Sequence, residues 1–305
     1  MNPYRLRAYS YLLIVALIWG VATPVIKYTL QGIDPLPFLT YRFGISAAFA
    51  IVFIAITKAN LTRIKKNFGL VFVYSILTTT VALGILFLGI DKTTVIDTAL
   101  ITAVGPLVTA VAGVYFLKEH VTKQERMGIA IAFLGTLVVV FGPVLSGNGS
   151  LKITGNLLVL GYIIIMAFSS VLSKKLVRKK VDPLTLTNVS FIIGFVTILP
   201  IAIFALGTNN LTSTIFNLEP NYQLGVWYMA LISGTLAYSL WVRGQKTIEI
   251  SEAGVFSYLI PLFAAPLGII WLGESITTPF VIGAILITAG VIIAEYKKRN
   301  KTSTT

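Results

Sequence analysis

Aromatic and hydroxyl side chains at helical spacing are the residues of this chain best suited to bind a small molecule. Tyr74 and Thr78 are four residues apart, as are Trp19 and Thr23, so each pair shares one face of a helix. Such groups bind neutral or zwitterionic organic compounds by stacking, cation–π contact and hydrogen bonding. The candidates are Trp19, Thr23, Tyr74, Thr78, Trp227, Tyr238 and Tyr258. We predict that these side chains line a substrate site.

Arg42 is the basic residue deepest inside a long apolar run. An ionisable residue in such a position is a functional candidate, because its burial is costly. A guanidinium can hold a substrate carboxylate through two parallel hydrogen bonds. The alternative is that the long side chain extends to the nearer membrane surface. We expect that second behaviour for Lys27, which lies closer to the end of its run.

Acid–base, nucleophilic and metal chemistry have few residues to use. The chain has no cysteine and one histidine, His120, and every Asp and Glu lies near the end of an apolar run. We therefore expect no enzyme activity, no cofactor and no metal site. We expect Asp97 and Glu252 to complement helix N-termini. Glu119 and Glu274 should pair with a loop lysine or with backbone amides.

The elements that position these residues are membrane-spanning helices. Of the 305 residues, 56% are hydrophobic and 11% charged, and the mean hydropathy is +0.88, whereas soluble proteins carry about 25% charged residues. Runs of this length and composition predict an all-α polytopic membrane protein with ten transmembrane helices. The predicted spans are 9–30, 35–57, 68–90, 96–117, 124–142, 154–174, 183–206, 223–243, 252–272 and 278–296. In a membrane, Trp227 has a second interpretation as part of the interfacial aromatic belt.

The basic residues favour one orientation. The chain has 24 Lys and Arg residues. If the N-terminus is cytoplasmic, nearly all of them fall on the cytoplasmic side, and Lys27, Lys92 and Lys152 are the exceptions outside it. Cytoplasmic loops collect positive charge, so we predict a multi-pass protein of the plasma (inner) membrane with both termini cytoplasmic. The net charge of +13 is then topological and indicates no nucleic-acid partner.

The chain also resembles itself. Residues 97–141 align without a gap with residues 252–296, and upstream Tyr74 aligns with Tyr228. The matched pairs include Pro106 and Pro261, Leu117 and Leu272, Glu119 and Glu274, Gly128 and Gly283, and Gly135 and Gly290. We predict a first five-helix repeat at 1–145, a linker at 146–151, and a second repeat with a basic cytoplasmic tail at 152–305. Because five is odd, the second repeat is inverted, an arrangement that provides two exchangeable conformations.

Prolines and glycines within the spans have separate predicted roles. Proline interrupts helical hydrogen bonding, and such breaks are tolerated in membranes where they face protein or a cavity. The predicted hinge or kink residues are Pro24, Pro106, Pro261 and Pro266. Small residues allow close helix packing, within the chain or at a dimer contact. The predicted packing residues are Gly128, Gly135, Gly283 and Gly290.

With these motifs in place, the chain resembles the drug/metabolite transporter superfamily, in its ten-span EamA-type branch. The resemblance rests on Trp19-Gly20, on Pro35, Pro37 and Arg42, and on the duplicated proline–glutamate–glycine block. It implies a basket of ten helices around a central cavity, and export or exchange of amino acids, other metabolites or drugs. The second repeat departs from the pattern, with Ala167-Phe168 in place of Trp19-Gly20 and Ser190 in place of Arg42.

The resulting expectation is a secondary transporter that moves small organic metabolites, either amino acids or drug-like compounds, by alternating access. A facilitator or exchanger is favoured, with proton-coupled antiport as the alternative, because no acidic residue lies in mid-membrane. The competing function is a membrane channel or scaffold without carrier activity. Expected partners are a small-molecule substrate and the lipid bilayer, with the chain as either a monomer or a homodimer.

Overall fold

The computed structural model describes residues 3–118, 122–145, 150–245 and 256–295. These residues are helical almost throughout, and no strand occurs among them. Inside a bilayer the polar backbone has no water to form hydrogen bonds with. A long apolar run therefore satisfies its backbone N–H and C=O groups within a helix. The predicted linker lies mostly in residues 146–149, outside the described ranges, as do Glu119, His120 and Glu252.

The helices follow the apolar runs of the sequence. Their bounds are α1 Pro3–Thr29, α2 Pro35–Thr57, α3 Thr62–Lys66, α4 Phe68–Ser75, η1 Ile76–Leu83, α5 Gly84–Lys92, α6 Val95–Thr102, α7 Gly105–Leu117, α8 Lys123–Leu145, α9 Ser150–Arg178, α10 Pro183–Leu206, α11 Thr208–Phe216, α12 Pro220–Trp227, η2 Tyr228–Leu236, α13 Ala237–Gln245, η3 Phe256–Leu259, α15 Ile260–Leu272 and α16 Thr278–Glu295. Several consecutive elements join end to end into one long stretch, such as α4, η1 and α5.

Seven stretches in the described part of the chain are long and apolar enough to cross a membrane. They are Leu6–Thr29, Pro35–Thr57, Phe68–Lys92, Val95–Phe116, Lys152–Arg178, Pro183–Leu206 and Pro220–Trp241. Three shorter apolar helices are Arg126–Gly142, Phe256–Leu272 and Thr278–Ala294. The chain is therefore an all-α polytopic membrane protein, as its composition predicts, and the count of ten spans stays a prediction.

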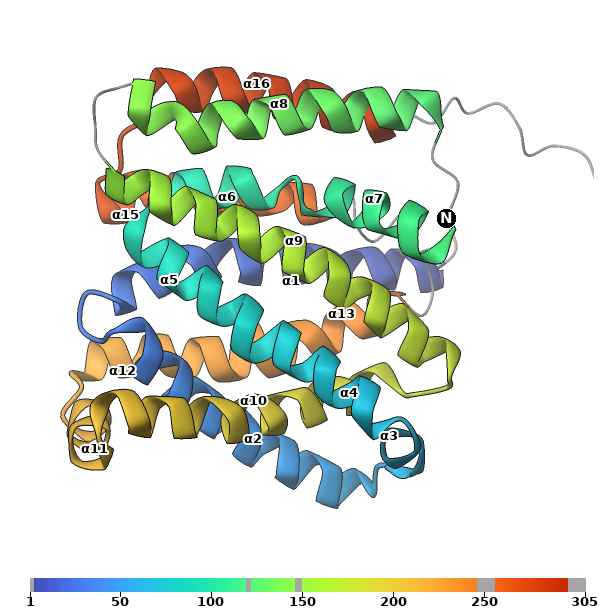
Figure 1. Ribbon diagram of the computed structural model, residues 1–305, viewed down its shortest axis with the longest axis vertical. Helices are drawn as coiled ribbons and strands as arrows, with labels where there is room; N and C mark the ends of the chain where they lie inside the picture. The colour runs from blue at the N-terminus through green and yellow to red at the C-terminus, as the bar shows by residue number, and fades with distance from the viewer. Residues whose placement is uncertain (1–2, 119–121, 146–149, 246–255, 296–305) are drawn as a thin grey trace, which may run out of the picture.

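The two predicted halves interlock rather than lie side by side as separate bodies (Figure 1). The second helix of each half packs on its counterpart, α2 on α10, and the last helix does the same, α8 on α16. The first helix of each half packs against the other half, α1 on α13 and α15, and α9 on α5 and α7. This exchange makes the centre of the molecule a meeting point of both halves.

Glycines bring α8 and α16 into backbone contact. A Cβ atom on Gly128 would lie 2.4 Å from the Gly290 carbonyl oxygen, and one on Gly290 would lie 2.5 Å from the Ala132 nitrogen. Gly135 and Gly283 oppose each other in the same way one to two turns further along, where a Cβ on Gly135 would lie 2.9 Å from the Gly283 oxygen. These glycines cover each other within one chain, so they are not exposed as a dimer contact.

Prolines interrupt the helices at two repeat-related places. The fourth span is broken rather than bent, because α6 ends at Thr102 and α7 begins at Gly105, just before Pro106. Pro261 likewise lies in the first turn of α15, after the 3-10 helix η3. Pro24 is buried within the continuous helix α1, and Pro266 lies exposed within α15.

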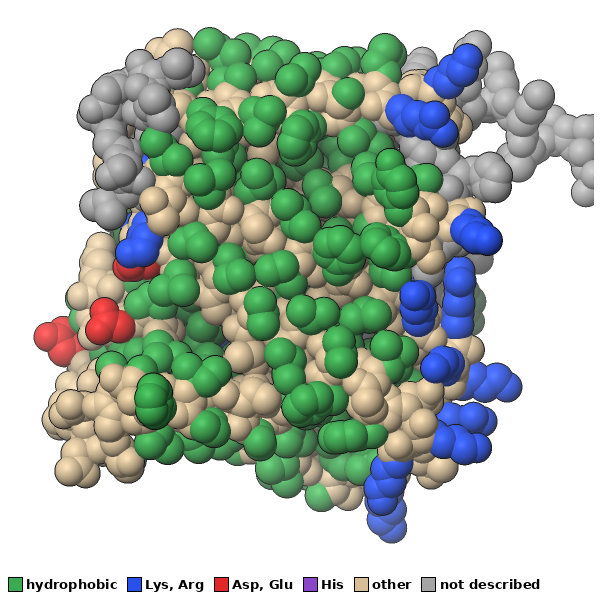
Figure 2. Space-filling model, viewed as in Figure 1, with side chains coloured by type: hydrophobic (Ala, Val, Ile, Leu, Met, Phe, Trp, Pro, Cys, Tyr) green, Lys and Arg blue, Asp and Glu red, His purple; other side chains and the backbone are tan. Residues whose placement is uncertain are grey.

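Charge divides the molecule into two ends. Figure 2 shows Lys and Arg side chains gathered at the end that holds α3, while the few visible Asp and Glu side chains lie at the opposite end, near α11 and α15. The band between the two ends is covered by hydrophobic side chains. Helix α1 begins and α16 ends at the basic end (Figure 1).

Candidate functional site

Arg42 is buried in the protein and has no counter-charge. Its side chain is 3% exposed, and its guanidinium carbon lies 5.5 Å from the ring centroid of Phe87 and 5.8 Å from that of Phe43. Nε and Nη1 are buried and donate no hydrogen bond. Across the described ranges, no carboxylate lies within ion-pair distance of it. The alternative in which Arg42 extends to the membrane surface is therefore wrong, because aromatic rings from two helices enclose the side chain.

Two phenols from further helices are electrostatic neighbours of the guanidinium. Arg42 on α2 interacts electrostatically with Tyr162 on α9 and Tyr238 on α13. Tyr238 in turn lies near Tyr74 on α4, whose phenol also interacts with the Thr78 hydroxyl on η1. We call Arg42, Tyr74, Thr78, Tyr162 and Tyr238 the Arg42 cluster. Its members come from both predicted halves, because these helices cross at the centre of the bundle.

The Arg42 cluster contains buried polar atoms without hydrogen-bond partners. The Arg42 Nε and Nη1 atoms are unpaired, and the Thr78 hydroxyl, which lies near the Tyr74 phenol, is not held by a hydrogen bond of full geometry. Its three tyrosines and Thr78 are half-buried rather than sealed. Buried polar groups in folded proteins are nearly always hydrogen-bonded. Two unpaired nitrogens on one buried guanidinium therefore indicate a site for a polar ligand.

Aromatic rings form the apolar wall of the cluster. The Trp19 ring on α1 lies 5.4 Å from the ring of Tyr238 and 5.3 Å from that of Trp241. Phe191 on α10 meets Tyr238 edge to face at 6.2 Å. The Trp19 indole N–H already donates to the Ser233 carbonyl in η2, at 3.2 Å. Trp19 can therefore offer a ligand its ring but not its polar group.

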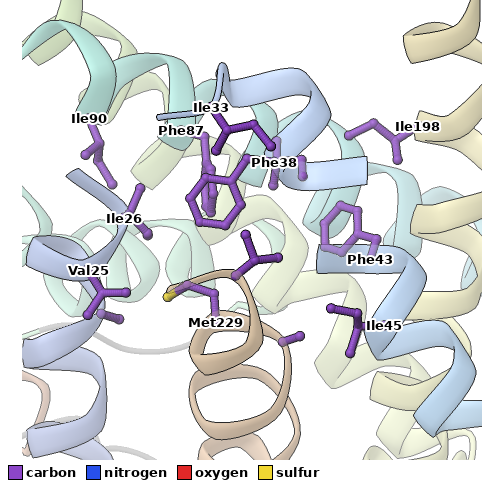
Figure 3. Close-up of a cluster of buried hydrophobic side chains, with 14 of the residues drawn as sticks. Val25, Ile26, Ile33, Phe38, Phe43, Ile45, Phe87, Ile90, Ile198 and Met229 are labelled. Carbon is purple, nitrogen blue, oxygen red and sulfur yellow. The ribbon is translucent and has the colours of Figure 1, made fainter. Parts of the chain in front are cut away.

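A packed hydrophobic core fills the neighbouring space, and Figure 3 shows its side chains. Phe38 on α2 and Phe87 on α5 lie at its centre with ring centroids 4.9 Å apart, and Met229 on η2 lies close by. Ile33 and Ile90, near the acidic end of the bundle, belong to the same core. Phe87 thus contacts both the Arg42 guanidinium and the core, so one side of the site is closed by apolar packing.

At the acidic end of the bundle, side chains form hydrogen bonds that join neighbouring helices. The Glu274 carboxylate, which follows α15, accepts hydrogen bonds from the backbone N–H groups of Val95 at 2.6 Å and Ile96 at 3.0 Å, in the first turn of α6. An anion at a helix N-terminus satisfies free N–H groups and complements the helix dipole. The expectation that Glu274 pairs with backbone amides is confirmed. Thr93 also donates a hydrogen bond to the buried Asn156 side chain of α9.

Lys27 has structural partners at the end of α5. Its Nζ donates to the carbonyl oxygens of Ile90 and Asp91, both at 2.8 Å, in the last turn of α5. A cation is favourable at a helix C-terminus, where carbonyl groups lack helical partners. These carbonyls lie at the end of a predicted span, beside the exposed Asp91, so the extension of Lys27 to the membrane surface stays a prediction.

Two predicted site residues, Trp227 and Thr23, do not join the Arg42 cluster by any hydrogen bond or ring contact shown in the structure, and Tyr258 lies in another element. Trp227 is 40% exposed at the end of α12, which suits the alternative of an interfacial aromatic residue. Thr23 is half-buried on α1, one turn beyond Trp19. Tyr258 is half-buried in η3, which packs on α1 and α15. Trp19, Arg42, Tyr74, Thr78 and Tyr238 do converge.

Tyr162 is a site residue that the sequence did not single out. It lies in the apolar run of α9, and its only spacing signal is that Ser169 and Ser173 follow it seven and eleven residues later on the same helix face. The sequence did indicate Glu274, but not its partners, which lie in α6, far away in the sequence.

Among the described residues, no group of His, Cys, Asp and Glu could hold a metal ion.

Comparisons with known proteins agree on a membrane transporter. A family model described as the EamA-like transporter family matches residues 6–141 and again 153–296. The chain is 29% identical over 297 residues to the uncharacterized transporter YyaM of Bacillus subtilis, covering 95% of this chain and 94% of that protein. It is 26% identical to the "Probable amino-acid metabolite efflux pump" of Salmonella typhimurium, with 92% of each chain covered. A solved crystal structure covers 97% of the chain at a TM-score of 0.67 and 17% identity, which supports the fold alone.

Proposed function

Because the chain belongs to the EamA-like transporter family, we propose that it moves small organic metabolites out of the cell, or exchanges them, by alternating access at the Arg42 cluster. Membrane transport is the family's activity, and the matched relatives are transporters rather than enzymes. The substrate, the direction and the conformational cycle are the proposed part. Amino acids, their derivatives and drug-like compounds are the candidate substrates, since two relatives bear the name amino-acid metabolite efflux pump.

The observation that carries this proposal is the unpaired polarity of the Arg42 cluster. A purely structural arginine in the membrane interior would be expected to have a carboxylate or several carbonyl partners. Arg42 instead has two unpaired nitrogens, Nε and Nη1, in a buried position. A substrate would supply the missing partners, and the rings of Trp19 and Tyr238 would contact its apolar part.

Alternating access is supported by the arrangement of the two halves. The family model matches the chain twice, once on each side of the linker, and the first helix of each half packs against the other half. The first and last described helices have their chain ends at the same end of the bundle (Figure 1), which agrees with ten spans. In this scheme the packing of Phe38 and Phe87 and the bonds of Glu274 close the outer side, and both must separate when that side opens.

Transport by the purified protein in liposomes tests the proposal. A thermal-shift screen of amino acids and their derivatives selects a ligand, and counterflow of the labelled ligand follows. We expect saturable uptake that is stimulated by the same compound inside the vesicles. Uptake that rises linearly with concentration would indicate a channel, and no uptake of any stabilising ligand would favour a scaffold.

Variants of the Arg42 cluster locate the site. Tyr238→Ala and Thr78→Ala should each weaken ligand stabilisation and counterflow at least several-fold. Tyr115→Ala is the matched control, because Tyr115 is 79% exposed on α7 and is not a member of the cluster. If both site variants keep the affinity of the unmodified protein, these residues do not belong to the substrate site.

A further inference from the structure

We infer that the substrate of this transporter is an organic anion with one negative charge, rather than a zwitterion, and that the membrane potential alone can drive its export. The inference rests on the proposed function and narrows it. Its starting point is a charge count around Arg42: a buried guanidinium with two unpaired nitrogens, and neutral phenols as its electrostatic neighbours.

An unpaired buried charge is an unfavourable state that a counter-ion relieves. Moving a charged group out of water costs several kcal/mol unless it is paired and hydrogen-bonded. Arg42 is 3% exposed and lies against the rings of Phe43 and Phe87, which attract the cation only weakly compared with a carboxylate. A ligand carboxylate would therefore restore charge balance at the site and accept hydrogen bonds from the two unpaired nitrogens of Arg42.

The charges around Arg42 also disfavour a free, zwitterionic amino acid as the substrate. Its ammonium group would need a carboxylate close to the site, and no acidic side chain interacts with any described member of the Arg42 cluster. Rings and hydroxyls would then be the ammonium's partners, while the site already holds one cation. The rings of Trp19, Phe191 and Tyr238 suit an aromatic or other apolar body on the anion.

A single negative charge also gives export a driving force. The interior of a cell is negative, and one charge moving through 100 mV gains about 2.3 kcal/mol, which corresponds to a concentration ratio of about 50. The mid-membrane carboxylate that proton coupling would require is then unnecessary. The Lys and Arg side chains at the basic end (Figure 2) would concentrate anions at the cytoplasmic entrance.

Binding of three matched compounds tests the charge preference. The probes are 3-phenylpropionate, phenylalanine and 3-phenylpropanamide, which share one ring and differ in charge, and the measurement is calorimetry on the purified full chain. We expect 3-phenylpropionate to bind at least 10-fold more tightly than the other two. Equal or tighter binding of phenylalanine would overturn the inference but leave the proposed transporter intact.

Arginine variants connect that preference to the site. Arg42→Gln should abolish the preference for 3-phenylpropionate over 3-phenylpropanamide, and Arg42→Lys should keep part of it. Arg63→Gln is the matched control, because Arg63 is exposed on α3. If the preference survives in Arg42→Gln, the anion site is elsewhere and the inference fails. The comparison of probes on the unmodified protein decides the matter if Arg42→Gln does not fold.

Voltage dependence tests the driving force. Liposomes with a potassium-diffusion potential of about 100 mV, positive inside, should accumulate labelled 3-phenylpropionate up to about 50-fold, and reversing the potential should expel it. Orientation of the protein in the vesicles does not alter this result. Trans-stimulated 3-phenylpropionate uptake that ignores the potential would contradict electrogenic export while supporting the carrier. Absence of any counterflow with every probe would contradict the proposed function itself.

Discussion

Arg42 should destabilise the ligand-free protein. Its two unpaired nitrogens lie among aromatic rings, and replacing a buried charge by an apolar side chain of similar volume is often neutral or stabilising by about 1–4 kcal/mol. We expect Arg42→Met to raise the thermal unfolding temperature without ligand, and to lose the further rise that ligand gives the unmodified protein. A clear drop in stability would mean that Arg42 has structural partners, contrary to our interpretation.

At the residue level, the sequence predicts which side chains are functional candidates better than it predicts which groups surround them. The depth of Arg42 in an apolar run marks it as unusual, but only the rings of Phe43 and Phe87 decide between enclosure and extension to the surface. Those rings come from α2 and α5, and their approach depends on helix packing. Lys27 illustrates the same limit, since its two carbonyl partners lie in α5. Tyr162 had only a weak spacing signal, from Ser169 and Ser173 on the same face of α9.

Single elements are held by contacts that can be broken one at a time, and the α6 cap is the clearest. Glu274→Ala removes the acceptor of the Val95 and Ile96 amides, at a cost of about 0.5–2 kcal/mol. We expect this change to favour opening of the outer side. The chain contains no cysteine, so a single Ala99→Cys on α6, where the native side chain is 1% exposed, can report opening. Its labelling by an impermeant maleimide should become several-fold faster.

Glu219→Ala serves as the control for that experiment. Glu219 lies at the N-terminus of another helix, α12, but its side chain makes no capping hydrogen bond. The charge change is the same, while no helix loses an acceptor. Equal labelling rates in the two variants would show that the Glu274 bonds do not hold the outer side closed.

The contact between α8 and α16 should tolerate no added atoms. A Cβ on Gly128 would lie 2.5 Å from the Ala294 nitrogen, and overpacking of this kind costs about 1–3 kcal/mol. We expect Gly128→Ala to lower the unfolding temperature measured in detergent. Gly161→Ala is the matched control: nothing lies within 4 Å of its added Cβ within α9, so a gain of about 0.5–1 kcal/mol in helix stability is expected.

At the level of elements, the sequence predicts helix bounds well and helix interiors poorly. The second and seventh spans begin at Pro35 and Pro183, as predicted, because proline suits the first turn of a helix and cannot extend one backwards. Helix starts of this kind can be predicted because they depend on the local sequence alone. The π-helical segments η1 and η2, the short helices α3 and α11, and the complete break before Pro106 were not predicted, because they depend on neighbouring helices rather than on hydropathy.

At the scale of the whole molecule, the two π-helical segments link the repeat to the site. Tyr74 aligns with Tyr228 in sequence, so η1 and η2 fall at nearly equivalent positions of the two halves. Wide turns of this kind occur mostly at functional sites. Thr78 lies in η1, and Ser233 in η2 supplies the carbonyl that fixes Trp19. The two predicted repeats thus each contain a π-helical segment at this position, yet with different chemistry.

The orientation of the whole molecule yields the last prediction. Thr62 on α3 and Ser213 on α11 are exposed, and these helices lie at opposite ends of the bundle (Figure 1). Positive charge gathers at the α3 end, which should therefore face the cytoplasm. In intact cells, an impermeant maleimide should label Ser213→Cys at once and Thr62→Cys only after the membrane is permeabilised. Reporter tags on the two termini should both read as cytoplasmic. The opposite labelling pattern would show that the protein has the reverse orientation in the membrane. The Glu274 contacts would then lie on the cytoplasmic side, and the membrane potential would drive an anion past Arg42 in the other direction along the molecule.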